Sequence, residues 1–108
     1  WAYSTAAVVE AATVISSGVP TRLSPYALID CDNLDHGCMT GNMASAYAWI
    51  QTSRNGIPPL EHYPKRKTSG CDRPALGKSP GIRTKGYCDL PVLSQDSELQ
   101  MLEALWQQ

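Results

Sequence analysis

The side chains in this sequence that could carry out covalent, acid–base or metal chemistry are four cysteines and two histidines: Cys31, Cys38, Cys71, Cys88, His36 and His62. In a short chain rich in glycine and proline, four cysteines are typical of an oxidising compartment, and they allow three complete disulfide pairings. The alternative is a set of buried free thiols in a cytosolic protein. Residue types alone leave both alternatives open.

Three of the cysteines and one histidine could instead form a small zinc site. Cys31, His36, Cys38 and Cys71 would supply a Cys₃His ligand set. Their spacings are not those of short-loop zinc knuckles, and apart from one glycine nothing suggests a tight ligand turn. We therefore expect no bound metal, and a zinc-binding module is the less favoured alternative.

Catalysis by a nucleophilic side chain needs a base within hydrogen-bond reach and a third group that orients this base. His36 lies inside the turn DHGC, and His62 lies in a loop bounded by proline. Neither histidine has such partners in the sequence. We expect both to be solvated loop residues rather than catalytic bases.

The composition excludes two classes of partner. The chain has 108 residues and a formal net charge of −1, so it lacks the basic surface that nucleic acids or anionic membranes require. No apolar run approaches the roughly 20 residues of a membrane span. We expect neither nucleic acid nor membrane as a partner.

The order of elements predicts three helices, a long loop, one strand and a last helix. Expected ranges are helices at 1–17, 24–32 and 42–54, a loop at 59–80, a strand at 82–89 and a helix at 96–107. The first helix is apolar around its whole circumference, which is typical of a buried helix, and Gly18 followed by Pro20 ends it. A lone strand cannot form a sheet, so we expect its pairing partners to lie outside this sequence.

Four blocks of sequence then appear in a familiar order: WAYS, LSPYALIDCDNLDHGC, GNMASAYAWI and HYPKRKTSGC. Together they resemble the papain-like cysteine peptidases, the family of the lysosomal cathepsins L and O. The resemblance implies an α+β fold of which this chain holds a part. That part is the helical left domain, with the first strand and helix leading into a sheet-rich right domain.

The resemblance also implies where the catalytic groups lie. The family's nucleophilic cysteine comes immediately before the run that starts here at Trp1, and its oxyanion-hole glutamine comes a few residues earlier. The histidine and asparagine would follow residue 108. We therefore expect no catalytic residue and no peptidase activity in these 108 residues. The parent would be an endopeptidase that needs no cofactor and forms a thioester acyl-enzyme.

Substrate-binding positions are expected after Cys38. Gly41 matches a family glycine whose backbone pairs with the substrate like an added strand. Met43 matches a wall of the pocket that receives the second substrate residue on the N-terminal side of the scissile bond. A methionine at this wall would favour apolar side chains. Thr40 replaces a second family glycine at the cleft floor. Asn42 and His36 match variable rim positions.

The resemblance implies one disulfide within the chain, between Cys31 and Cys71. Cys38 would pair with a cysteine upstream of Trp1 and is expected to be unpaired here, whereas Cys88 has no counterpart in the family. Expected partners are peptide or protein substrates, the remaining domain of the same chain, a pro-segment and cystatin-like inhibitors. The expected location is the lysosome or the secretory pathway. A homologue in which another residue replaces the nucleophile stays open as an alternative.

Overall fold

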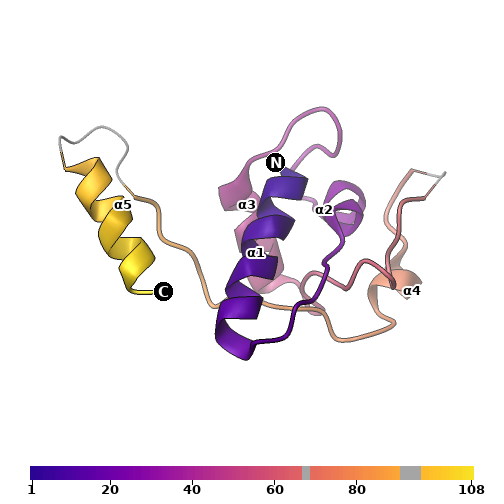
Figure 1. Ribbon diagram of the computed structural model, residues 1–108. Coiled ribbons are helices and arrows are strands. Elements are labelled where there is room, and N and C mark those ends of the chain that lie inside the picture. Colours follow the sequence, from indigo (N-terminus) through magenta and orange to yellow (C-terminus); the bar gives the residue numbers. More distant parts are fainter. Residues whose placement is uncertain (67–68, 91–95) are drawn as a thin grey trace.

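The computed structural model describes residues 1–66, 69–90 and 96–108. Within these ranges the chain forms α1 (Ala2–Ser17), α2 (Pro25–Cys31), α3 (Met43–Thr52), α4 (Arg73–Leu76) and α5 (Ser97–Trp106). Helix α1 packs against both α2 and α3, and α5 lies apart from them (Figure 1). Nowhere in the described ranges is a helix both long and apolar enough to span a membrane.

Helix α1 ends as its sequence predicts. Gly18 adopts a left-handed conformation with φ of 71°, and its backbone N–H donates to the carbonyl of Val14 at 2.8 Å. A residue without a Cβ adopts this conformation at little cost, so the chain can leave the helix at this point.

The expectation that α1 is buried on all sides is wrong for the described chain. Its buried residues, Ala2, Thr5, Ala6 and Val9, form one stripe at helical spacing. In contrast, Val8, Val14 and Ile15 are exposed. The reason is that α2 and α3 cover only one side of α1, and composition does not tell how many sides of a helix find a partner.

Polar side chains cap the next two helices. The hydroxyl oxygen of Ser24 accepts from the N–H of Ala27 at 3.2 Å, and Pro25 occupies the first helical position of α2. The side-chain oxygen of Asn42 accepts from the N–H of Ala44 at 2.7 Å at the start of α3. Both helices therefore begin where a side chain satisfies a backbone donor that the helix cannot satisfy itself.

The expected strand at 82–89 does not form among the described residues. Only Ile82 pairs, in an isolated antiparallel bridge with Ile57 whose two hydrogen bonds are 2.8 and 2.9 Å long. A second isolated bridge joins Leu23 to Pro59. A strand needs a neighbouring strand to accept its hydrogen bonds, and residues 83–89 have none here.

The segment expected as a loop at 59–80 contains a short helix and is anchored to α2. Helix α4 starts at Asp72, whose carboxylate accepts from the N–H of Ala75 at 3.0 Å. Tyr63 is completely buried in this segment, and its hydroxyl group donates to Asp30 at 3.2 Å and accepts from the N–H of Asp72 at 3.0 Å. These contacts order a stretch that has little regular structure of its own.

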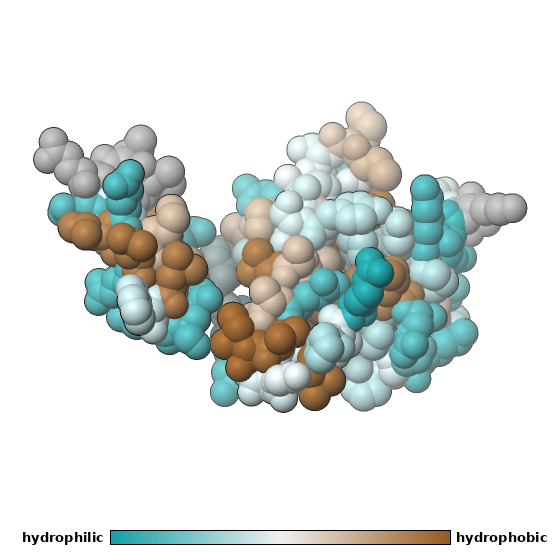
Figure 2. Space-filling model, viewed as in Figure 1, coloured by the Kyte–Doolittle hydropathy of each residue, from teal (hydrophilic) through white to brown (hydrophobic). Residues whose placement is uncertain are grey.

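Helix α5 has no buried residue. Its large apolar side chains, among them Leu99, Leu102 and Leu105, are more than half exposed. Figure 2 shows hydrophobic surface along α5, and a second group over the far end of α1, where Val14, Ile15 and Val19 are exposed. The main core lies elsewhere, between α1, Leu28 of α2 and Trp49 and Ile50 of α3.

Candidate functional site

The first turn of α1 lies against the loop that connects α2 to α3. The indole N–H of Trp1 donates to the backbone carbonyl of Gly37 at 3.0 Å. The same indole lies so close to Gly41 that a Cβ atom on this glycine would be 2.4 Å from two of its ring carbons. The start of α1 and the tip of the loop are therefore in direct contact, although about 40 residues separate them in the sequence.

The loop has its own hydrogen bonds. The N–H of His36 donates to the carbonyl of Thr40 at 3.0 Å, and the N–H of Met39 donates to the carbonyl of His36 at 3.0 Å. Gly37 has a φ of 56°, a conformation that favours glycine. The result is a compact turn whose outer side chains, Cys38, Met39 and Thr40, are exposed.

Asp35 ties this loop to the start of α3. One of its carboxylate oxygens accepts from the backbone N–H of Asn42 and from the hydroxyl group of Ser45, both at 2.8 Å. The segment from Asp35 to Asn42 is thus held at one end by a carboxylate and along its length by the Trp1 indole. Its backbone around Gly41 has a defined position relative to α1.

A second carboxyl group, Asp32, lies beneath the loop. One of its oxygens accepts from the N–H of Leu34 at 2.8 Å, and the other has no N–H or O–H donor among the described residues, like the second oxygen of Asp35. The pKa of Asp32 is raised to about 6, mainly because the carboxyl group is buried; the neighbouring carboxyl group of Asp35 acts in the same direction, and the backbone N–H groups of Leu34 and Asp35 oppose the rise.

The predicted site residues separate into two places. Asn42 and Met43 line a hollow of about 630 Å³. Val8 and Val9 of α1 and Tyr47 of α3 also line it. Residues 84 and 86–89 close its other side. Gly41 lies against Trp1 instead, and His36 and Thr40 are exposed on the loop. The side chain of Asn42 is already used as the cap of α3.

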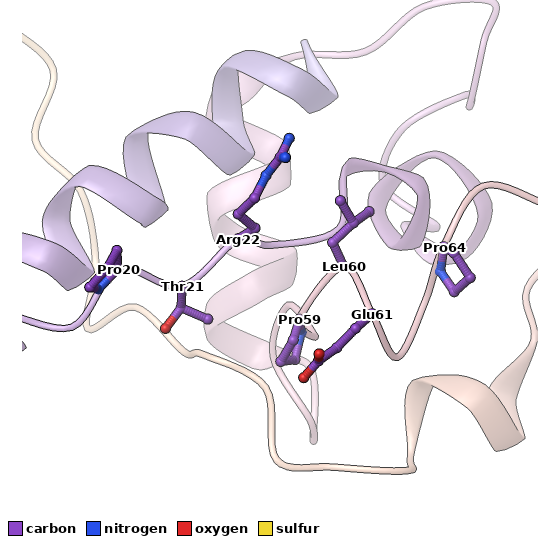
Figure 3. Close-up of a pocket in the computed structure, with 7 residues that line it drawn as sticks. All are labelled: Pro20, Thr21, Arg22, Pro59, Leu60, Glu61 and Pro64. Carbon is purple, nitrogen blue, oxygen red and sulfur yellow. The ribbon is translucent and has the colours of Figure 1, made fainter.

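Another hollow, of about 620 Å³, lies between residues 20–22 and 59–64 (Figure 3). Three prolines, Thr21 and Leu60 line it, and Arg22 and Glu61 are its charged residues. It contains no thiol and no imidazole, and none of the predicted site residues. This hollow therefore offers no group for nucleophilic catalysis.

The pairing of the cysteines argues against the zinc alternative. Cys31 and Cys71 form a disulfide with an S–S distance of 2.06 Å and a Cα–Cα distance of 4.6 Å, as the family resemblance implied. Two of the four suggested zinc ligands are therefore not available. The described residues contain no group of three or more side chains that could hold a metal. Cys38 and Cys88 are free and exposed.

The two histidines lie on exposed or partly exposed loops. The Nδ1 atom of His62 is 2.7 Å from the hydroxyl oxygen of Ser79, and its Nε2 atom is 3.7 Å from the carboxylate of Glu61. His36 is exposed. His62 thus interacts with the hydroxyl group of Ser79 and the carboxylate of Glu61. Within the described residues, no further side-chain hydrogen bond orients Ser79 or Glu61.

Comparison with known protein families gives one match over the full sequence. The model of the family described as "Papain family cysteine protease" matches residues 1–108. The chain belongs to the papain family. Its fold class is therefore the papain-like α+β fold, of which the described residues show the helical part and almost no strand.

Similar proteins with curated descriptions are plant cysteine proteases. Thiol protease SEN102 of Hemerocallis sp. is 35% identical over 101 residues, which are 93% of this chain and 28% of that protein. Mexicain of Jacaratia mexicana is 30% identical over 105 residues, or 97% of this chain and 47% of mexicain. The chain therefore spans between about a quarter and about half of these papain-family relatives.

Solved structures agree on the fold. The cysteine protease CMS1MS2 of Carica candamarcensis, in complex with E-64, has a TM-score of 0.80 and 27% identity, covering 95% of this chain and 47% of that chain. The ragweed pollen allergen Amb a 11, a cysteine protease in its proform, has a TM-score of 0.81 at 24% identity. The match covers 94% of this chain and 30% of the allergen's chain. This second likeness shows the fold alone.

Sequence reasoning missed three residues that shape this site. The contacts of Trp1 with Gly37 and Gly41 join residues far apart in the sequence, and no local pattern announces them. Asp32 and Asp35 lie in a stretch whose residue types are typical of a turn. The spacing of two acids beside a glycine is common in turns, so the burial of these carboxyl groups depends on the tertiary structure.

Proposed function

We propose that this chain is the helical half of a cysteine endopeptidase that hydrolyses peptide bonds through a thioester intermediate. In this proposal the nucleophilic cysteine directly precedes Trp1, and the catalytic histidine and asparagine follow residue 108. The chain itself supplies no catalytic residue and is inactive alone. Its residues position the nucleophile and bind the substrate.

The observation that supports the proposal most directly is the contact between the start of α1 and the loop at residues 36–42. A thiol at the N-terminus of a helix has a lowered pKa because the helix dipole stabilises the thiolate. The loop that would pair with a peptide lies next to this helix end, since Trp1 contacts both Gly37 and Gly41. A nucleophile and a strand-like substrate edge would then be neighbours, as acyl transfer requires.

We also propose that the peptidase prefers an apolar side chain in the pocket lined by Met43. Met43 borders a hollow of about 630 Å³ together with Val8, Val9 and Tyr47. A flexible thioether beside aliphatic and aromatic side chains favours bulky apolar groups. Thr40, Asn42 and His36 are proposed to border the substrate from the exposed loop.

The proposed location is the lysosome or the secretory pathway, because a disulfide between Cys31 and Cys71 forms and persists in an oxidising compartment. The proposed partners are peptide substrates, the remaining domain of the same protein and a pro-segment. Cystatin-like inhibitors are a further proposed partner.

The test begins with the transcript that encodes residues 1–108 together with their flanking codons. The full-length protein is expressed and assayed with fluorogenic peptides. These peptides differ only at the second residue on the N-terminal side of the scissile bond. We expect hydrolysis that is abolished by thiol alkylation and by a Cys→Ser change directly before Trp1. The peptide with an apolar side chain should be favoured over a charged one by about 10–100-fold in kcat/KM.

A matched pair of variants addresses the pocket. Met43→Glu should lower kcat/KM for the apolar peptide by about tenfold or more, whereas Met39→Glu, on the exposed loop, should change it less than about twofold. If a residue other than cysteine precedes Trp1 and no peptide is hydrolysed, the protein is a non-catalytic homologue. Equal effects of the two variants would contradict the role of Met43 alone.

A further inference from the structure

Glycine at position 41 is needed for a reason other than its backbone conformation. Gly41 is not among the glycines with positive φ, so its φ does not require glycine. The space around it is different: a Cβ atom would lie 2.4 Å from Cδ2 and Cε2 of Trp1 and 2.6 Å from its Nε1. Such distances are far below van der Waals contact, and the obstacle is a rigid aromatic ring rather than a flexible chain end.

The same ring makes a second contact on the same loop. Its N–H donates to the carbonyl of Gly37 at 3.0 Å, so one indole holds two points of the loop, four residues apart. Within the described residues, the three side chains between these points, Cys38, Met39 and Thr40, are exposed, and Met39 is 90% exposed. Asp35 holds only the end of the loop that meets α3.

We propose that Trp1 is a positioning residue: its indole seats the backbone of residues 37 and 41, and this packing, rather than substrate access alone, requires glycine at position 41. Trp1 is the N-cap of α1. Its contacts with the loop therefore fix the position of the substrate-pairing edge relative to the start of the helix. The consequence for substrate binding rests on the proposed peptidase function. The packing itself does not.

A double-mutant cycle in the full-length protein tests the packing without any activity assay. Gly41→Ala should lower the Tm by about 3–8 °C because the new methyl group collides with the ring. In a Trp1→Leu background, where the smaller side chain leaves room, the same Gly41→Ala change should lower the Tm by less than about 2 °C. Gly77→Ala is the matched control, since a Cβ there meets nothing nearer than 3.5 Å.

Two results would overturn the packing claim. One is a Gly41→Ala loss of the same size in both backgrounds, which would show that the ring is not the obstacle. The other is a Gly41→Ala variant as stable as Gly77→Ala.

A kinetic comparison tests the positioning role. Trp1→Phe keeps an aromatic ring but removes the donor to Gly37. It should raise KM about tenfold for a peptide with several residues before the scissile bond, with kcat changed less than about twofold. For a substrate with a single such residue, kcat/KM should stay within about twofold, since this substrate does not reach the loop. An equal loss on both substrates would contradict positioning and indicate a general effect on the fold.

The two experiments fail separately. A wild-type protein without peptidase activity would remove the proposed function and the positioning of a substrate, whereas the Tm cycle would still decide whether the indole requires glycine at position 41.

Discussion

The segment anchored by Cys71 contains a helix of 4 residues, and the segment that ends in α5 contains a helix of 10, yet the shorter helix has the better-packed surroundings. In the first, Tyr63 is completely buried, its hydroxyl group has two hydrogen-bond partners, and a disulfide joins the segment to α2. In the second, α5 has no buried residue, and Trp106 is 88% exposed.

The comparison shows that apolar content does not decide which segment is well packed. Helix α5 carries large apolar side chains, whereas the 59–77 segment has only a four-residue helix and depends on Tyr63 and a covalent link. Most of a helix's stability in a protein comes from packing of its apolar face. An apolar stripe without a partner in the described chain therefore adds little to stability, and a few buried polar contacts can fix a segment poor in helix.

The strongest test of this comparison is removal of the disulfide. A Cys31→Ala, Cys71→Ala double variant should lose about 4 kcal/mol, because the link closes a loop with a sequence separation of 40. The measurement is native-state hydrogen exchange at the amides of α2 and α3. Cys88→Ala is the control, since this exposed free thiol lies on the route to α5 and should change stability by less than about 0.5 kcal/mol. Similar protection in both variants would contradict the anchoring role.

The next effect is a dependence on pH through Asp32. The folded pKa of Asp32 is about 6 and its ordinary value is 3.8, so between these pH values the folded state holds a proton that the unfolded chain releases. The contribution of Asp32 to stability should therefore be fully present below about pH 4, decrease by on the order of 2–3 kcal/mol as pH rises to about 6, and be absent above.

Unfolding at several pH values checks this prediction. Asp32→Asn should remove the decline, because an amide does not titrate, whereas Asp89→Asn in the exposed C-terminal segment should leave it unchanged. A wild-type profile that rises between pH 4 and 6 would have the wrong sign for a buried carboxyl group with a raised pKa.

A smaller effect is expected from the hydroxyl group of Tyr63. Tyr63→Phe leaves the N–H of Asp72 and the carboxylate of Asp30 without this partner, and should cost about 1–3 kcal/mol. Tyr87→Phe provides the contrast in the other region, since Tyr87 is 45% exposed and keeps its ring contact with Tyr47. Chemical unfolding of the two variants measures their free energies of unfolding. We expect only the Tyr63 change to be destabilising, and an equal loss from both changes would contradict the difference between the two regions.

The smallest effect should come from α5. In the 108-residue chain, Leu102→Ala should change the stability of the α1–α3 core by less than about 0.5 kcal/mol, because this side chain is 54% exposed. Leu28→Ala, at a fully buried position in α2, should cost about 2–5 kcal/mol. Hydrogen exchange at the amides of α3 measures both. A large loss from Leu102→Ala would show that α5 packs on the core.

Local signals predicted the limits of the first helices, because Gly18, Ser24 and Asn42 act on their immediate neighbours. The disulfide followed from the family resemblance. Helix α4 was missed although Asp72 and Pro74 are ordinary signals for a helix start, since the surrounding residues favour a loop. The pattern of 82–89 predicted a strand, but a strand also depends on a partner that no local pattern supplies.

The candidate site was predicted less completely. The resemblance predicted His36, Thr40, Gly41, Asn42 and Met43 as binding positions, and their role stays a prediction. Of these residues, Asn42 and Met43 line a common hollow. The contact of Trp1 with Gly41 and the burial of Asp32 beside Asp35 were not predicted, because they depend on how distant segments meet. The capping role of Asn42 is consistent with its residue type and its place directly before α3.

The bond between Cys31 and Cys71 closes a covalent ring of the residues between them, and Met39 on that ring is 90% exposed. A peptidase cut beside Met39 would consequently open the ring without releasing either piece. Such a nicked molecule would keep its mass apart from one added water and migrate as one band, and it would separate into two fragments only after treatment with a reductant.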